Sequence, residues 1–378
     1  MDKFLLLEKD LMKLSIMMVL AAGFFGFAGL LAMIFMQWVT RQSYAADMVD
    51  KHGIAEVSAS RLGGVMILGG SIAVMLMAVI AGTEAPATGL LGTPLYAWVG
   101  VLGCAGLGLV EDIRNDVLKP RYRLLSKALI FTMVFALWPE LIPNEIGIFG
   151  VDTLLAYSGS ALLLTVLFCV GFLNAANMAD GANGLMPSIF FTAFLIFYLE
   201  YGGLGFEALM TGCGLFLIFN VISGRLFLGD AGAYGLAAGV ALAGLYFYAQ
   251  GIFSAPFLAV MLAYPCIEIV VSMARRWLRG RSMFLPDNDH LHNRIHWHFK
   301  RRFKSVNLAN SLTGLLIAAA SAGIALAGYL GSWWPVTGSE WLIVFCIQCV
   351  LYVLVFLQTG RVGDQDQTAE AGLVVQSD

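Results

Sequence analysis

The sequence predicts an all-α integral membrane protein, a polytopic bundle of about eleven transmembrane helices. The chain has 378 residues, of which 59% are hydrophobic and only 12% are charged, and its mean hydropathy is +0.81. Soluble domains carry roughly 25% charged residues, so this chain lacks the polar groups that would cover a soluble surface. The composition excludes a disordered chain, a nucleic-acid-binding protein and a disulfide-stapled secreted domain.

Apolar segments recur along the whole chain at lengths that suit a bilayer. A spanning helix needs roughly 20 apolar residues. We expect spans at 14–38, 63–81, 95–110, 124–138, 153–173, 185–201, 207–222, 232–249, 257–274, 308–330 and 340–357.

The basic residues predict the orientation. One alternate set of connecting segments, together with Lys127, holds 19 of the 22 Lys and Arg residues, and the opposite loops hold none. Cytoplasmic loops carry this excess, which places the N-terminus outside and the C-terminus inside. We expect residues 1–358 to form a single polytopic domain and residues 359–378 a disordered cytoplasmic tail. The cytoplasmic loops are 39–62, 111–123, 174–184, 223–231 and 275–307.

Polar motifs that the spans do not explain lie in the same basic loops. A carboxylate at the end of a span must be solvated, paired or metal-bound, because an isolated charge in the bilayer costs several kcal/mol. If these loops meet on one face, they form an acidic, amide-rich cavity beside a basic loop, which suits a phosphorylated ligand held by a divalent cation. The motifs contain Glu111, Asp112 and Asp116; Asn174, Asn177, Asp180 and Asn183; Asp230; and Asp287, Asp289, His290, His292 and Arg294.

Each motif also has a simpler interpretation. The acids at 111–116 can form exposed ion pairs with neighbouring basic residues, the segment 174–184 can be a polar turn, and the arginines at 275–281 can anchor the cytoplasmic side. A membrane transporter with a cytoplasmic polar gate is the alternative function. That alternative predicts charges within the spans, where Glu268 is the one acid placed well inside.

The order of the motifs resembles the polyprenyl-phosphate N-acetylhexosamine-1-phosphate transferases, the glycosyltransferase family 4 enzymes that include bacterial undecaprenyl-phosphate GlcNAc-1-phosphate transferases. The resemblance covers about residues 40 to 330. The chain departs from the family pattern at Glu111, where the family has Asp, and at Asn293, where the family has a second adjacent histidine. The motifs that carry it are Arg61-Leu62-Gly63-Gly64, Leu109-Val110-Glu111-Asp112, Asn174 to Gly181, Phe227 to Gly232, and Asp287 to Arg294.

The resemblance implies an enzyme that transfers a sugar-1-phosphate from a UDP-sugar to polyprenyl phosphate and releases UMP, with GlcNAc as the default sugar. It implies that Asn177 and Asp230 hold Mg²⁺, with Mn²⁺ as the alternative ion. It makes Asp112 the group that activates the lipid phosphate, either as a base or through a covalent phospho-enzyme, with Asp116 assisting. The implied substrate-binding residues are Glu111, Asp180, Asn183, His290, His292 and Arg294. Of these, Asn183 would contact the uridine, and His290, His292 and Arg294 would contact the sugar diphosphate.

The same resemblance implies a multi-pass protein of the bacterial cytoplasmic membrane with its active site facing the cytoplasm. The reaction would be the first membrane step of a cell-envelope polysaccharide pathway, such as that of O-antigen, teichoic acid or capsule. Its partners would be the UDP-sugar, the polyprenyl phosphate and the lipid bilayer, with a homodimer left open. A CDP-alcohol phosphotransferase is disfavoured, because its acids lie in one compact segment and here they extend from 111 to 289.

Overall fold

The computed structural model describes residues 2–42, 59–82, 95–114, 117–148, 150–280 and 288–360. These residues form helices and no strand, and one isolated parallel bridge joins Ser60 to Leu226. The elements are α1 (Asp2–Val39), α2 (Gly63–Ile80), α3 (Leu95–Arg114), α4 (Pro120–Leu137), η1 (Pro139–Leu141), α5 (Val151–Leu155), α6 (Ser158–Ala179), α7 (Leu185–Tyr201), α8 (Leu204–Ser223), α9 (Gly229–Ala249), α10 (Ala255–Met261), α11 (Ala263–Leu278), α12 (Leu291–Arg302), α13 (Val306–Ala318), η2 (Ala319–Gly323), α14 (Ile324–Leu330) and α15 (Trp341–Gln358).

The described helices confirm a multi-pass membrane protein. Seven of them are long and apolar enough to cross a membrane, or eight if the bent pair α10–α11 counts as one span. Each of the eleven predicted spans falls on a helix or on consecutive helices, but α3, α4 and α7 are not among those seven. The number eleven therefore stays a prediction, as does the side of the membrane on which each terminus lies.

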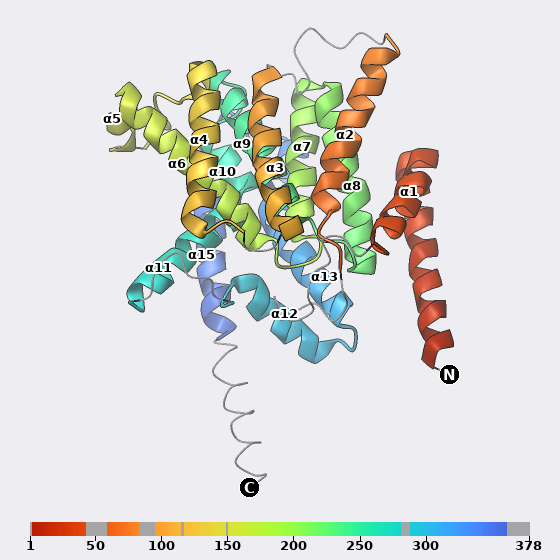
Figure 1. Cartoon of the computed structure of the whole chain (residues 1–378). Coiled ribbons are helices and arrows are strands. Elements are labelled where there is room, and N and C mark those ends of the chain that lie inside the picture. The colour runs from red at the N-terminus through yellow and green to blue at the C-terminus, as the bar shows by residue number, and fades with distance from the viewer. Residues whose placement is uncertain are drawn as a thin grey trace.

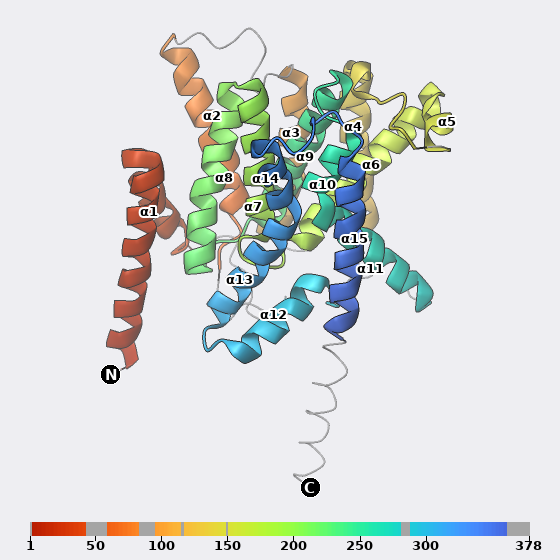
Figure 2. The ribbon, with the colours of Figure 1, turned by 180° about the vertical axis from the view of Figure 1, so that it is seen from behind.

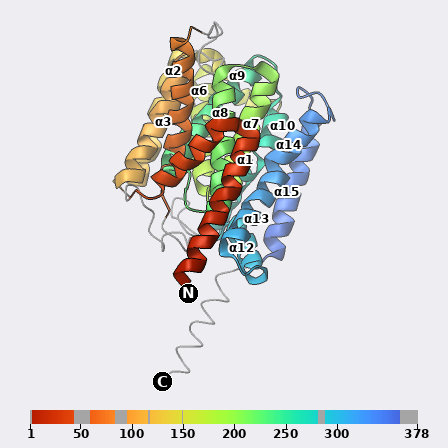
Figure 3. The same ribbon diagram turned by 90° about the vertical axis from the view of Figure 1, so that its right-hand side faces the viewer.

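Helix α1 differs from the single straight span predicted at 14–38. It is broken at Gly26, whose φ of 60° and ψ of −147° are not helical. A Cβ on Gly29 would collide with the backbone of Ala21, so the two halves fold back on each other (Figures 1 and 3). As a result, the start of α1 and the end of α15 lie toward the same end of the bundle (Figure 2), whereas the prediction put the two termini on opposite sides.

Helix α9 forms the centre of the bundle. It is rich in Gly and Ala, and most of its residues are buried inside the protein. Small residues let neighbouring backbones approach closely, and α2, α3, α6 and α7 all pack around α9 (Figure 1). The first turn of α9, which carries Asp230, is thereby held among these helices.

The pair α10–α11 bends by 82° at a break next to Leu262. The break is stabilised by polar side chains of its neighbours: the Tyr264 N–H donates to Ser321 Oγ at 3.0 Å, and Gln348 Nε2 donates to the Val260 carbonyl at 3.3 Å. In an apolar environment such freed backbone groups need partners. The bend sends α11 outward at the lower end of the bundle, where α12 also lies (Figures 1 and 2).

Candidate active site

The segment before α2 fixes the segment before α9. The Ser60 N–H donates to the Arg225 carbonyl at 3.1 Å, and the Phe227 N–H donates to the Ser60 carbonyl at 2.8 Å. A Cβ on Gly64 would collide with the backbone of Gly232, so only glycine allows the two helix starts to approach this closely. The Arg61-Leu62-Gly63-Gly64 motif thus sets the position of the Asp230 turn.

Asp112, at the end of α3, binds the first turn of α9 through both carboxylate oxygens. Oδ1 accepts the Asp230 N–H at 2.9 Å, and Oδ2 accepts the Ala231 N–H at 2.8 Å. These N–H groups have no partner within their own helix, and Gly229 permits the turn with a φ of +71°. Asp112 is only 2% exposed, so the structure gives this predicted catalytic acid a positioning role as well.

Asn177 and Asp180 bring the end of α6 to the same place. Asn177 Nδ2 donates to Asp230 Oδ1 at 2.5 Å. Burial raises the pKa of Asp180 well above its ordinary value, and the nearby charges of Asp230 and Asp112 raise it further. Three acids and one amide, contributed by α3, α6 and α9, therefore form a carboxylate centre: Asp112, Asn177, Asp180 and Asp230.

The donor chemistry of the carboxylate centre fits a hard divalent cation. Oxygen ligands are those that Mg²⁺ prefers, usually one or two from the protein with phosphate and water completing the shell. Among the described residues, no group of three or more His, Cys, Asp or Glu side chains forms a metal shell by itself. The centre therefore suits a cation that is shared with a phosphorylated ligand, and it does not suit a structural metal held by protein alone.

Glu111 serves the neighbouring loop in the structure. Its Oε1 accepts the Leu118 N–H at 2.9 Å, and its Oε2 lies 3.6 Å from Arg123 Nη1. These contacts connect the end of α3 to the start of α4 and match the ion-pair interpretation of this motif. The predicted role of Glu111 in substrate binding stays a prediction. Asp116, the second predicted catalytic acid, lies outside the described residues.

Asn183 joins the α6–α7 turn to α13. Its N–H donates to Asn310 Oδ1 at 3.2 Å, and its Nδ2 donates to Asn307 Oδ1 at 3.0 Å. The next residue, Gly184, has a φ of +79° and donates its N–H to Asn220 Oδ1 at 2.6 Å. Asn183 is buried and its Nδ2 donates within the protein, and its predicted contact with uridine stays a prediction.

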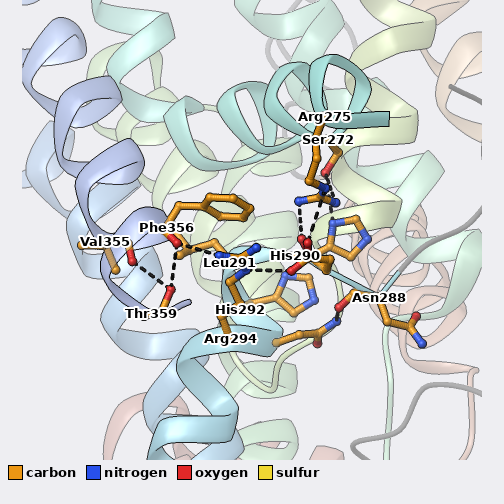
Figure 4. A network of polar contacts seen from close by, with 12 residues as sticks. Ser272, Arg275, Asn288, His290, Leu291, His292, Arg294, Val355, Phe356 and Thr359 are labelled. Carbon is orange, nitrogen blue, oxygen red and sulfur yellow. Dashed lines mark hydrogen bonds and ion pairs between the residues drawn. The ribbon is translucent and has the colours of Figure 1, made fainter. Parts of the chain in front are cut away.

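The predicted histidine motif lies against one face of α11. Tyr264, Glu268 and Ser272 are spaced four residues apart, which places them on the same side of a helix. His290 Nδ1 lies 3.0 Å from Glu268 Oε1, and His292 Nδ1 lies 2.8 Å from the Tyr264 hydroxyl. Figure 4 shows the two imidazole rings side by side, with their centroids 5.4 Å apart. We define Tyr264, Glu268, Ser272, His290, His292 and Tyr352 as the histidine centre.

The two centres meet at the α6–α7 turn. A Cβ on Gly181 would collide with His292 Nε2, so that nitrogen points at the turn that follows Asp180. Burial lowers the pKa of His292 to about 3, with the neighbouring His290 as the second cause. His292 is therefore neutral at physiological pH. The predicted convergence of the 174–184 motif with the histidine motif is present in the structure for residues 288–294; Asp287 lies outside the described residues.

Arg294 is committed to partners inside the protein. Its Nε binds Asp289 Oδ1 at 2.7 Å, its Nη1 donates to the Phe356 carbonyl at 2.7 Å, and its guanidinium lies 3.5 Å from the centre of the Phe356 ring. Arg275 Nη1 also donates to the Asp289 carbonyl. With 4% exposure, Arg294 acts as a link between α12 and α15, and its predicted contact with the sugar diphosphate stays untested.

The sequence interpretation missed two buried charged residues, Lys127 and Glu268. Lys127 Nζ donates to Asn174 Oδ1 at 2.8 Å and lies 3.5 Å from the centre of the Tyr234 ring. Glu268 binds the histidine motif, as described above. In the sequence, Lys127 is a basic residue near the end of a predicted span and Glu268 is an acid within one. An ionisable residue within an apolar helix indicates a functional site by default. That signal is present in the sequence at both Lys127 and Glu268.

The family comparison covers the central helices of this arrangement. Residues 94–248 match the model described as glycosyl transferase family 4. The matched region contains α3, α6 and α9, which supply the carboxylate centre, and the predicted resemblance is confirmed. The histidine centre lies beyond the matched region.

The chain is also similar to curated proteins. The chain is 29% identical over 219 residues to a decaprenyl-phosphate N-acetylglucosaminephosphotransferase of Mycobacterium tuberculosis, covering 50% of this chain and 54% of the relative. It is 29% identical over 189 residues to an undecaprenyl-phosphate alpha-N-acetylglucosaminyl 1-phosphate transferase of Thermotoga maritima, covering 50% and 56%. It is 26% identical over 283 residues to a phospho-N-acetylmuramoyl-pentapeptide-transferase of Shouchella clausii, covering 68% and 82%. The chain thus spans about half the length of the first two relatives.

Proposed function

We propose that this protein transfers an N-acetylhexosamine-1-phosphate, with GlcNAc as the default, from a UDP-sugar to a polyprenyl phosphate. The observation that carries the proposal is the carboxylate centre, in which Asp112, Asp180 and Asp230 meet Asn177 at one end of the bundle. The printed names of the relatives supply the reaction class, since all three are phospho-sugar transferases. The transporter alternative has no support among these relatives.

In the proposed reaction, a phosphate oxygen of the lipid attacks the sugar-bearing phosphorus of the donor. The bond from that phosphorus to the bridging oxygen breaks, and UMP leaves with the electron pair. The reaction brings several anionic phosphates together, so positioning and charge neutralisation account for much of the catalysis. Asn177 and Asp230 would hold Mg²⁺, which when bound would neutralise charge on the transferring phosphates.

The residues of the chain divide the remaining work. Asp112 fixes the Asp230 turn and would activate the lipid phosphate, either by proton removal or by covalent attack. Lys127, whose Nζ donates to Asn174, would supply a positive charge beside the phosphates when it is protonated. His292 and its supports face the turn where the sugar would lie. We place this site on the cytoplasmic side of a bacterial inner membrane, because the surrounding loops carry the basic residues.

The proposal is tested by incubating the purified full-length protein with undecaprenyl phosphate and a panel of UDP-sugars while UMP release is measured. We expect release with a UDP-N-acetylhexosamine, none without the lipid, and loss on chelation with recovery by Mg²⁺ or Mn²⁺. Formation of a lipid-linked product without release of UMP would contradict the mechanism. Turnover that is unchanged by chelation would contradict it as well. No turnover with any UDP-sugar would contradict the function.

The orientation is tested separately by cysteine labelling in a cysteine-free background. A cysteine at Asp152, in an outer predicted loop, should react with an impermeant thiol reagent in intact cells. A cysteine at Lys119, in a basic loop, should react only after the membrane is permeabilised. The reverse pattern would overturn the cytoplasmic location of the site.

A further inference from the structure

Glu268 is an ionised acceptor at the base of the histidine centre. The side chain is 0% exposed, and five hydrogen-bonding groups surround its two oxygens. All five can donate, and a backbone N–H can do nothing else, so hydrogen bonding favours the carboxylate over the acid. The neighbours of Oε1 are Ser272 Oγ at 3.0 Å and His290 Nδ1 at 3.0 Å, and those of Oε2 are Tyr352 Oη at 2.7 Å, the Leu291 N–H at 3.1 Å and Tyr264 Oη at 3.2 Å.

The charge of Glu268 decides where the Tyr264 proton points. The Tyr264 hydroxyl has one proton and two lone pairs, and it contacts Glu268 Oε2, the His292 N–H at 3.3 Å and His292 Nδ1 at 2.8 Å. The carboxylate can only accept, so the hydroxyl donates to Glu268. The backbone N–H can only donate, so it takes one lone pair. The remaining lone pair requires a proton on His292 Nδ1.

This arrangement leaves His292 Nε2 as an acceptor. The ring is neutral, because burial lowers its pKa, and a neutral imidazole that is protonated at Nδ1 has a free lone pair at Nε2. That nitrogen points at Gly181, directly after Asp180, where the two centres meet. A neutral acceptor repels a diphosphate oxygen and attracts a hydroxyl or an amide N–H.

We propose that Glu268 and Tyr264 are positioning residues that hold His292 in its Nδ1–H tautomer, so that its Nε2 accepts a hydrogen bond from the sugar of the donor. The identity of the ligand rests on the proposed function, whereas the assignment of the tautomer does not. The proposal narrows the predicted sugar-diphosphate contact of His292 to the sugar, through a hydroxyl or the amide N–H of its N-acetyl group.

The tautomer is tested by nitrogen NMR of the full-length protein labelled with ¹⁵N-histidine, in which the His292 signals are assigned by their loss in His292→Gln. We expect a protonated Nδ1 and a bare Nε2. Tyr264→Phe should shift the proton to Nε2. The matched control, Tyr329→Phe, removes a hydroxyl that donates to a different glutamate, Glu200, at 2.8 Å and outside both centres, so it should leave the tautomer unchanged. A protonated Nε2 in the wild type would overturn the proposal.

The sugar contact is tested by calorimetric titration with UDP-GlcNAc and with UDP, each in the presence of Mg²⁺. Tyr264→Phe should weaken UDP-GlcNAc binding about tenfold, the scale of one hydrogen bond, and leave UDP binding within about twofold. Tyr329→Phe should change neither. An equal loss for both ligands in Tyr264→Phe would overturn the sugar contact. Intact UDP-GlcNAc binding without UMP release would contradict the proposed transfer reaction while the tautomer assignment stands.

Discussion

The carboxylate centre and the histidine centre stabilise their buried acids in different ways. In the carboxylate centre, Asp112 accepts backbone N–H groups and Asp230 accepts an amide of Asn177. In the histidine centre, Glu268 is surrounded by five donors, and the adjacent Asp289 binds arginines of α11 and α12. The first centre keeps its acids close together among neutral donors, which favours a cation and phosphates. In the second centre, the negative charges already have hydrogen-bond donors and arginines as partners, which favours a rigid support for the histidines.

The comparison would break if the carboxylate centre did not depend on its charge. Asp230→Asn should lower UMP release about 10³-fold, because it removes a charged oxygen from the place where transferring phosphates are neutralised. Asp152→Asn is the matched control, since Asp152 accepts a backbone N–H at 2.7 Å in an outer predicted loop, and it should keep normal activity. Near-normal turnover of Asp230→Asn at limiting Mg²⁺ would remove Asp230 from the proposed metal site.

Substitutions of the two neighbouring acids of α3, Glu111 and Asp112, should affect UMP release to very different extents. Asp112→Asn should lose about 10²- to 10³-fold in turnover, because both native oxygens accept N–H groups and an amide nitrogen would face one of them. Glu111→Asp should stay within about threefold, since Glu111 stabilises a loop and such contacts contribute about 1 kcal/mol or less. Full turnover of Asp112→Asn would shift attention to Asp116.

The junction between the two centres is open to a geometric test. Gly181→Ala places a Cβ against His292 Nε2 and should push the histidine centre away, lowering turnover about 10- to 100-fold. Gly171→Ala, ten residues earlier in α6, has nothing within 4 Å of the new Cβ and should leave turnover unchanged. Equal behaviour of the two variants would show that the centres work independently.

The smallest expected effect concerns Arg294. Arg294→Lys loses the planar contact with the Phe356 ring and at least one of two directed hydrogen bonds. We expect a loss of about 1–2 kcal/mol in stability, seen as a fall of a few degrees in melting temperature, with the KM for the donor within about twofold. A large rise in KM at an unchanged melting temperature would instead support direct substrate binding by Arg294.

The sequence predicted the membrane class and much of the carboxylate centre. An apolar span is located in the sequence by its length and hydropathy and does not need an amphipathic pattern. Each expected span falls on a helix or on consecutive helices. Polar residues at span ends must be solvated, paired or metal-bound, and this marks four residues of the centre in the sequence: Asp112, Asn177, Asp180 and Asp230. Their convergence then follows from loops that lie at the same membrane face.

Only the tertiary structure decided what each side chain contacts. The sequence cannot show that Gly26 folds α1 back on itself, because several glycines stand nearby and only one takes a non-helical conformation. It cannot show that Asn183 and Arg294 spend their donors inside the protein, or that Glu268 lies under the histidines. Those facts depend on the 82° break between α10 and α11, which turns the polar face of α11 toward residues 290–292. Hydropathy is a sum over residues and carries the span pattern, whereas a hydrogen bond depends on direction and distance between residues far apart in the chain.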